Sequence, residues 1–291
     1  MNDFTAFMAE ACARVDTALD ECLPSVAERG ELAEAMRHIV FSGGKRLRPA
    51  LVELGALDVG GELSRARGAA AAVELMHAYS LVHDDLPAMD DAQQRRGKPC
   101  VHVLWGDAMG VLAGDALLTL SFEVLARGTP ADAPVGEMCA VLARHTGWAG
   151  MVGGQCDDLA AEGAEPDLEH VRRIHEGKTA ALLAACLQLG ALAGGGDPAH
   201  VERLGGVGLD LGLAFQIVDD LLDVEGESAD LGKAAGADAE AGKLTWPAVV
   251  GAAQARSDAE QLVSDALQRS RGGAAEGLIA ALGAKILARR S

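Results

Sequence analysis

The sequence predicts an all-α fold, with about ten main helices in a single domain over residues 1–291. Only 3% of the residues are aromatic, and no long segment alternates polar and apolar residues as strands require. Apolar residues recur instead at helical spacing between glycine and proline stops, without a linker of disordered composition or a fixed-period repeat. A chain of 291 residues with 49% hydrophobic content can bury the core of such a domain.

Helix signals divide the N-terminal half into five segments. An amphipathic stretch ends near Pro24, and a second ends at Gly43-Gly44, while Pro49 suits the first turn of a third. The predicted helices cover residues 4–22, 31–41, a segment starting near 49, 64–85 and 107–127. The segment 64–85 is apolar on nearly all sides, so we expect it at the centre of the fold.

The C-terminal half is predicted to hold the remaining helices. Asp167 is a candidate N-cap, and Asp197-Pro198 combines a cap with a first-turn proline. The expected helices cover 134–151, 167–193, 198–224, a segment opened by the capping box Ser257-x-x-Glu260, and a last one ending at Arg289-Arg290. The helix over 134–151 leads into a glycine-rich segment, 150–154, and the Gly- and Asp-rich segment 226–243 is expected to be a loop. The apolar helix 198–224 should share the centre with 64–85.

Charge and cysteine content exclude several classes of function. The net charge of −18 argues against partners such as nucleic acid or anionic membrane surfaces. The six cysteines show no CxxC spacing, which removes zinc and thioredoxin-type sites and fits a reducing cytoplasm. The N-terminus lacks the pattern of a signal peptide, and no uncharged stretch of 18 residues predicts a membrane span.

A first acidic motif follows the apolar segment 64–85. Asp84, Asp85, Asp90 and Asp91 put four carboxylates into eight residues. A regular helix would put Asp84 and Asp90 on different faces, so Pro87 must break the helix for them to converge. Oxygen ligands at this density suit a hard divalent cation, Mg²⁺ above all, although a solvated acidic helix end is the simpler explanation of one such cluster.

A second acidic motif ends the predicted helix 198–224. Asp219 and Asp223 lie one turn apart on one face, with Asp220 about 100° away. Carboxylates at a helix C-terminus oppose the macrodipole, and two such violations in matched contexts favour a functional site over two solvated helix ends.

Two basic segments stand out in this acidic chain. Lys45, Arg46 and Arg48 follow Gly43-Gly44, and Arg95, Arg96 and Lys98 follow the first acidic motif. Arginine and lysine at these positions can hold diphosphate oxygens, the aspartates another diphosphate through metal. Gly177-Lys178-Thr179 looks like the end of a nucleotide P-loop, but Arg172 replaces the required glycine and no strand precedes it, so only Lys178 is kept as a phosphate ligand.

Together these motifs resemble the trans-isoprenyl diphosphate synthases, and most closely the bacterial farnesyl diphosphate synthases of that family. The matching segments run in the family's order: 43–49, 77–91, 95–99, 112–118, 153–155, 178–179, 216–223, 231–233 and 242–243. The resemblance implies an all-α fold around a central apolar cleft, usually a homodimer. It also implies condensation of isopentenyl diphosphate with dimethylallyl and geranyl diphosphate to farnesyl diphosphate, with about three Mg²⁺ ions per site and Mn²⁺ as a substitute.

The resemblance also assigns roles to individual residues. Metal ligands are expected among Asp84, Asp85, Asp90, Asp219, Asp220 and Asp223, the last two acting from behind the ions. Lys45, Arg48, His77 and Arg96 match the isopentenyl diphosphate site, while Arg95, Lys178, Lys233 and Lys243 match residues that hold the allylic diphosphate. Thr179 and Gln216 match residues beside the developing carbocation. Metal and cations would stabilise the leaving diphosphate, which is where charge develops.

Product length in this family is set on the helix before the first motif. Tyr79, with Ser80 beside it, stands at the position expected to form the floor of the cleft and predicts the C15 product. Tyr79 as an ordinary core residue is the simpler alternative. Ala92-Gln93-Gln94 replaces the family's acidic continuation, Cys100 stands where threonine is usual, and Trp105 has no assigned role.

Several other functions remain open. Geranyl or geranylgeranyl diphosphate synthesis differs only in product length. A class I terpene cyclase would lack the Gly-Gly-Lys-x-x-Arg segment, and a non-catalytic partner subunit typically loses one acidic motif. A di-iron bundle needs two Glu-x-x-His motifs, and the chain has only Glu74-x-x-His77.

Overall fold

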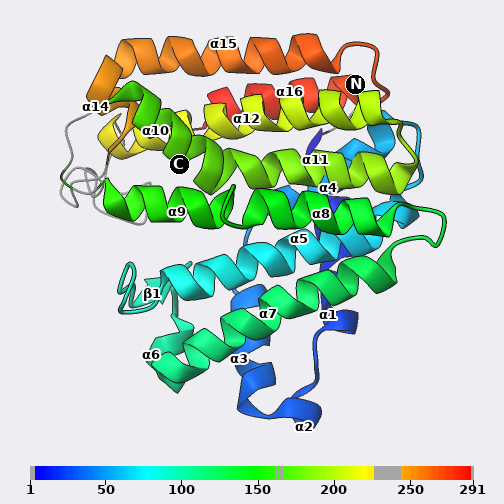
Figure 1. The fold of residues 1–291 in the computed structure, drawn as a ribbon, viewed down its shortest axis with the longest axis vertical. Helices are drawn as coiled ribbons and strands as arrows, with labels where there is room; N and C mark the ends of the chain where they lie inside the picture. Colours follow the sequence, from blue (N-terminus) through cyan, green and yellow to red (C-terminus); the bar gives the residue numbers. More distant parts are fainter. Residues whose placement is uncertain (1–3, 162, 164–166, 226–243, 290–291) are drawn as a thin grey trace.

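The computed structural model is a bundle of helices, which confirms the predicted fold class (Figure 1). It describes residues 4–161, 163, 167–225 and 244–289. Within these residues lie fifteen α-helices, one π-helical turn and a two-stranded hairpin. Twelve of the α-helices have eight or more residues, against about ten expected. The bundle is therefore slightly more divided than the sequence predicts.

The N-terminal half follows the predicted helices closely. Its elements are α1 (Phe4–Cys22), α2 (Val26–Arg29), α3 (Glu31–Val40), α4 (Leu47–Asp58), α5 (Leu63–Asp84), β1 (Gln94–Arg95), β2 (Lys98–Pro99), α6 (Val101–Trp105) and α7 (Asp107–Gly128). The short α2 and α6 and the hairpin were not predicted. Strands of two residues give too short an alternation to be detected in sequence.

The C-terminal half departs further from the expected boundaries. Its elements are α8 (Val135–Thr146), α9 (Met151–Ala160), α10 (Leu168–His175), the π-helical η1 (Glu176–Ala180), α11 (Ala181–Gly194), α12 (Pro198–Glu225), α14 (Trp246–Val250), α15 (Ala252–Ser270) and α16 (Glu276–Leu287). The caps predicted at Asp167 and Asp197 form, since each carboxylate accepts the backbone N–H three residues on, at 3.2 and 2.9 Å.

Three boundaries in this half differ from the prediction. The helix expected over 134–151 ends at Thr146, and the glycines at 153 and 154 lie inside a further helix, α9, where they allow close packing against η1. The helix expected over 167–193 is interrupted by η1. The proposed capping box at Ser257 lies within α15, which begins at Ala252 after Gly251. The predicted loop at 226–243 lies outside the described residues.

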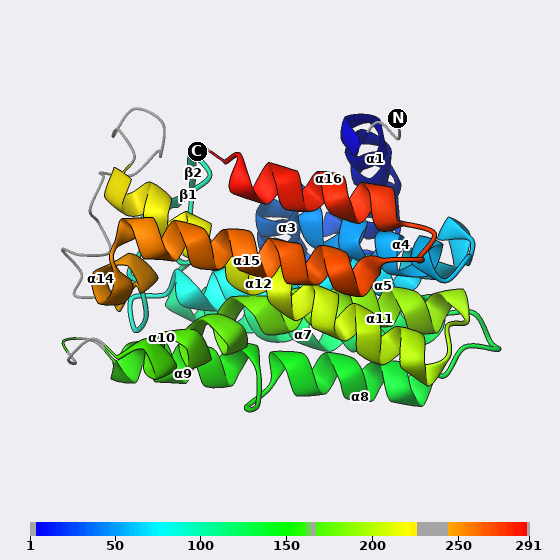
Figure 2. The same ribbon diagram turned by 90° about the horizontal axis from the view of Figure 1, so that it is seen from above.

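The most buried helix is α11, which packs against α4, α5, α8 and α12. The predicted central helices α5 and α12 flank it, and α7 and α15 cover their outer sides (Figures 1 and 2). Both views place the C-terminal ends of α5 and α12 at the same end of the bundle, where the hairpin also lies. The fold therefore brings the two acidic motifs to one end.

Two helical stretches are long and apolar enough to span a bilayer by length and composition alone. Residues 168–194 are 72% buried in the most apolar window, as a core helix is. The other, α7, is only 33% buried in its window and leaves Val111 and Leu112 exposed. An apolar helix with an open face of this kind is typical of a contact surface as well as of a membrane segment.

Candidate active site

The first acidic motif lies where α5 ends. The helix stops at Asp84, and the chain turns back so that the N–H of Asp90 donates to the carbonyl of Asp84 at 2.8 Å. Asp91 closes the turn in the left-handed region, with φ of 47°. The break that Pro87 was expected to cause is therefore present, and it brings Asp84 and Asp90 back together.

Charge around this turn is unevenly compensated. Asp85 is 1% exposed and accepts three contacts of 2.7 to 3.0 Å from Arg95. Burial and a hydrogen bond to Asp85 raise the pKa of the Cys100 thiol to about 12, so the cysteine stays protonated and donates. Burial, together with Asp90, raises the pKa of Asp84 to about 6 against the pull of Lys178. Asp84 thus lacks the cation that Asp85 has.

The second acidic motif occupies the last turns of α12. Asp220 is buried and takes part in three hydrogen bonds, with His175 Nε2 at 2.7 Å, the N–H of Trp246 at 2.8 Å and Gln216 Nε2 at 3.0 Å. Asp219 accepts from Arg289 at 2.9 Å. Asp220 is therefore committed to holding neighbouring elements in place, which agrees with a role behind the ions rather than on them.

The π-helical turn η1 presents Lys178 and Thr179 to this network. Lys178 Nζ lies 2.6 Å from Asp158 on α9, and Thr179 Oγ1 donates to Gln216 Oε1 at 2.8 Å. Because Gln216 in turn bonds Asp220, a continuous chain of hydrogen bonds joins η1 to α12. Single π turns inside α-helices are frequent at functional sites, since the extra residue redirects side chains.

The basic segments line a cavity of about 940 Å³. Lys45, Arg48, His77 and Arg96 all contribute to its wall, as the resemblance implied. Burial, followed by repulsion from Arg48, holds the pKa of His77 well below its usual range, so the imidazole is neutral. Burial also lowers the pKa of Arg48, whose Nε has no hydrogen-bond partner among the described residues. An anion entering here would relieve an uncompensated positive charge.

Backbone strain is concentrated in the same segments. Arg46 and Arg96, with φ of 47° and 54°, join Asp91 as the non-glycine residues with positive φ in the described chain. Such conformations cost about 1–3 kcal/mol each and persist where surrounding contacts impose them. Arg46 is fixed by Glu74, Asp16 and the carbonyl of Val40, at 2.8, 2.9 and 2.7 Å. Gly44 has φ of 125°, a conformation that other residues rarely adopt, and a Cβ there would push against the Arg96 guanidinium at 2.7 Å.

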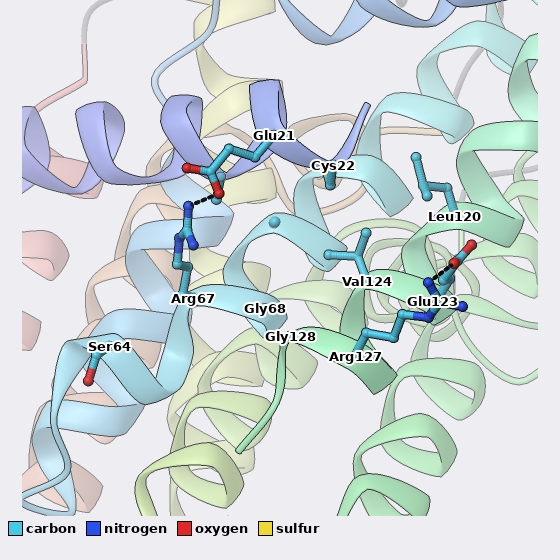
Figure 3. Close-up of a pocket in the computed structure, with 12 residues that line it drawn as sticks. Glu21, Cys22, Ser64, Arg67, Gly68, Leu120, Glu123, Val124, Arg127 and Gly128 are labelled. Carbon is cyan, nitrogen blue, oxygen red and sulfur yellow. Dashed lines mark hydrogen bonds and ion pairs between the residues drawn. The ribbon is translucent and has the colours of Figure 1, made fainter. Parts of the chain in front are cut away.

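A second cavity, of about 530 Å³, lies between α1, α5 and α7 (Figure 3). Figure 3 shows ion pairs of Arg67 with Glu21 and of Arg127 with Glu123 at this pocket. Each cation is already matched by a carboxylate, and none of the predicted substrate or metal residues lines it. The larger, cationic cavity is therefore the one that the predicted substrate-binding residues line.

Carboxylate oxygens that could bind a hard cation are present, but in the described residues they do not yet lie close enough together to coordinate one ion. Asp84 and Asp90 flank the turn after α5, and Asp219 lies on α12 at the same end of the bundle. Among the described residues, no three carboxylate, imidazole or thiol groups converge closely enough to hold one ion. The donor set fits Mg²⁺, and the raised pKa of Asp84 is what a carboxylate awaiting a counter-ion would have. Asp223 is half-buried on α12, one turn after Asp219.

The proposed floor residue points away from the metal ligands. Tyr79 is 6% exposed, and its ring packs edge-on against His83 at 5.6 Å. His83 lies 3.1 Å from the carbonyl of Val111, so this side of α5 faces α7. At about 100° per residue, Tyr79 lies about 140° from Asp84 around the helix, while Ser80 lies about 40° away. Tyr79 can therefore bound a cleft only along the seam between α5 and α7.

The sequence did not predict several residues that contact the site, and two residues that it did predict are not among those the structure describes. Lys233 and Lys243 lie outside the described residues. Three residues that the sequence did not predict, each at least 20 positions away, hold residues of the site. Arg289 holds Asp219, Asp158 holds Lys178 and His175 holds Asp220. The one sequence signal for Asp158 is the nearby pair Gly153-Gly154, because these glycines allow α9 to pack closely against η1. The role of Trp105 is now visible: it packs edge-on against His38 at 5.4 Å and so joins α6 to α3.

An all-α bundle that carries two aspartate motifs and a cationic cavity is the arrangement expected of a prenyltransferase. The family model described as polyprenyl synthetase matches residues 29–282. The chain belongs to the polyprenyl synthetase family, which confirms the resemblance found in its motifs.

Relatives and solved structures agree with this assignment. The chain is 46% identical over 271 residues to the heterodimeric geranylgeranyl pyrophosphate synthase large subunit 1 of Arabidopsis thaliana, covering 91% of this chain and 73% of the relative. An FPP/GFPP synthase of Zymomonas mobilis matches with a TM-score of 0.86 and 38% identity, over 98% and 99% of the two chains. A geranyltransferase of Helicobacter pylori, solved with magnesium and isoprenyl diphosphate, matches with a TM-score of 0.82 and 31% identity over 97% of each chain.

Proposed function

We propose that the chain condenses isopentenyl diphosphate with an allylic diphosphate, in a reaction assisted by Mg²⁺ and ending at a short-chain trans product. The observation that carries this proposal is the pairing of a cationic cavity with two aspartate motifs, in one of which the pKa of Asp84 is raised to about 6. The cavity suits a diphosphate held by Lys45, Arg48 and Arg96 directly. The carboxylates Asp84, Asp90 and Asp219 suit a second diphosphate held through metal.

The chain's own groups account for the remaining steps. Divalent metal would neutralise charge on the leaving diphosphate. Lys178 and Arg95 would add positive charge there, while the oxygens of Thr179 and Gln216 would face the allylic cation left when the C–O bond breaks. The double bond of isopentenyl diphosphate attacks this cation, and a proton then passes to the departed diphosphate. Neutral His77, which lines the cavity, would offer a diphosphate a hydrogen bond without adding charge.

Geranylgeranyl diphosphate, with twenty carbons, is our first candidate for the end product. The Arabidopsis relative with 46% identity is named for it, and the ring of Tyr79 lies on the far side of α5 from Asp84. Farnesyl diphosphate, predicted from Tyr79, is the second candidate, because a buried ring at the α5–α7 seam would stop the chain early. The Zymomonas structure, which is that of an FPP/GFPP synthase, keeps this candidate open.

A homodimer in the cytoplasm is the assembly we propose. Val103, Leu104, Val111 and Leu112 form an exposed apolar surface on α6 and α7, and a second copy would cover it. All six cysteines are unpaired, which suits a reducing compartment. We also propose about three Mg²⁺ ions per site, with Mn²⁺ as a substitute.

One incubation tests the proposal. Protein is supplied with Mg²⁺, isopentenyl diphosphate and either dimethylallyl or geranyl diphosphate, and the products are identified by chain length. A C20 product supports the first candidate and a C15 product the second. Absence of product with either primer would refute catalysis and favour a non-catalytic subunit. EDTA should abolish turnover, and Mg²⁺ or Mn²⁺ should restore it.

A further inference from the structure

The last helix delivers a cation to the second aspartate motif. Arg289 follows α16, and its Nη2 donates to Oδ1 of Asp219 at 2.9 Å. The guanidinium carbon also lies 4.1 Å from the ring centroid of Phe215. Phe215 and Asp219 are one turn apart on α12, so stacking and charge together seat the guanidinium on one face of that helix.

The same guanidinium is only partly satisfied where it lies. Its Nη1 is buried and has no hydrogen-bond partner among the described residues. A buried donor without a partner costs about 1–3 kcal/mol, and more when it is charged. Arg289 also lines the 940 Å³ cavity together with Lys45, Arg48 and Arg96. One edge of the guanidinium is therefore bound to a carboxylate, while the rest borders a cavity suited to a diphosphate.

A divalent cation and the guanidinium of Arg289 would compete for Oδ1 of Asp219. A divalent cation that takes this oxygen removes the arginine's counter-ion and repels its positive charge. The side chain has several rotatable bonds and is 21% exposed, so it can turn without moving α16. Because Arg289 lines the cavity, a diphosphate bound there could take the place of Asp219 as its partner.

We propose that Arg289 is a displaceable counter-ion. It neutralises Asp219 while no metal is bound, and it donates to a diphosphate in the cavity once a divalent cation takes Asp219. This inference rests on the proposed function of Asp219 and of the cavity. Metal and isopentenyl diphosphate should then each strengthen the binding of the other, because coupling between two sites is reciprocal.

The variant Arg289→Gln separates this role from a structural one. Binding of Mn²⁺ is measured by electron paramagnetic resonance without substrate, and binding of isopentenyl diphosphate by calorimetry at saturating Mn²⁺. We expect Mn²⁺ to bind about five-fold or more tightly in the variant, and isopentenyl diphosphate to bind more weakly by a similar factor. Effects of opposite sign distinguish a displaced counter-ion from local damage, which would weaken both.

Two further variants complete the test. Arg289→Lys keeps the charge and should restore Mn²⁺ affinity toward the wild-type value. Lys285→Gln, one turn earlier on α16 and lining the same cavity, should weaken isopentenyl diphosphate without changing Mn²⁺ affinity. Unchanged or weaker Mn²⁺ binding in Arg289→Gln overturns the inference. If the wild-type protein still makes product in that case, the proposed function stands on its own.

Discussion

Among the carboxylates of the described residues, Asp84 has the most strongly raised pKa. Its neighbour Asp85 is matched by Arg95, whereas burial and Asp90 raise the pKa of Asp84 to about 6. Between about pH 4 and pH 6, Asp84 is therefore protonated in the folded state, whereas in the unfolded state, with an ordinary pKa of about 3.9, it has already lost its proton. In metal-free protein, the stability contributed by this proton is lost as the pH rises from about 4 through about 6.

Asp84→Asn should therefore be more stable than wild type at neutral pH and inactive. Without metal, we expect its free energy of unfolding to exceed that of the wild type by up to about 3 kcal/mol at pH 7.5, with the gain vanishing near pH 4. Turnover should fall by at least about 10²-fold, because a metal ligand is lost. Urea titrations in EDTA at several pH values measure the first effect and product assays the second. Equal stability of the two proteins at all pH values would contradict the raised pKa.

Tyr79 carries the prediction about product length. Replacing the ring with a methyl group in Tyr79→Ala opens space at the α5–α7 seam, so products should lengthen by at least one five-carbon unit. The hydroxyl is not needed for this stop, and Tyr79→Phe should keep the wild-type product. Radiolabelled products separated by chain length decide the matter. An unchanged product in Tyr79→Ala would mean that the tyrosine only fills the core.

The π turn η1 is the element on which the site depends most. It interrupts a helix that the sequence predicts to be continuous, and it turns Lys178 and Thr179 toward Asp158 and Gln216. Its position is fixed by α9, since a Cβ at Gly154 would lie 2.2 Å from the backbone N of Lys178. A backbone atom cannot move aside as a flexible side chain can, so these two elements touch only because of glycine.

Gly154→Ala should disturb catalysis by separating α9 from η1. Overpacking of this kind costs about 1–3 kcal/mol of stability, and a displacement of about 1 Å at Lys178 can lower turnover about 10²-fold. Gly136→Ala on α8 is the matched control, since nothing lies within 4 Å of the added Cβ, and it should be neutral or slightly stabilising. Thermal melts and kcat are compared for the two variants. Wild-type kcat in Gly154→Ala would show that η1 tolerates the shift.

The exposed apolar face of α7 bears on how the whole molecule assembles. The helix packs on α5 along one side and exposes Val111 and Leu112 on the other. An open apolar face on a chain of net charge −18 is hard to explain without a covering partner. It is adjacent to the Tyr79 seam through His83, so subunit contact would also support the wall that limits product length.

Val111→Asp combined with Leu112→Asp should shift the protein from dimer to monomer. Charges buried in an apolar contact cost several kcal/mol unless they are paired. Val152→Asp on α9 is the control, because that valine is about as exposed, at 48% against 43%, but lies on a different helix. Sedimentation velocity gives the oligomeric state of each variant. A wild-type protein that is monomeric at micromolar concentration would refute the proposed dimer.

Local patterns were enough to predict much of this protein. Helix existence followed from apolar spacing and from Gly, Pro and Asp stops, because these act within a few residues of chain. The acidic and basic motifs could be found because charge is conspicuous when it stands beside apolar segments, as Asp84 and Asp219 do. The predicted helix boundaries were wrong where tertiary packing outweighs local preference. Examples are α9, which contains Gly153-Gly154, and η1, which interrupts the helix predicted over 167–193.

The sequence by itself determined the fold class, the family and the identity of the charged groups that handle diphosphate. The tertiary structure alone decided how those groups are used: Asp85 neutralised by Arg95, Asp220 committed to His175 and Trp246, Asp84 left without a cation, and Asp219 paired with Arg289. These pairings join residues up to 70 positions apart. Burial and counter-ions set the charge state of a carboxylate, and both depend on which helices the fold brings together.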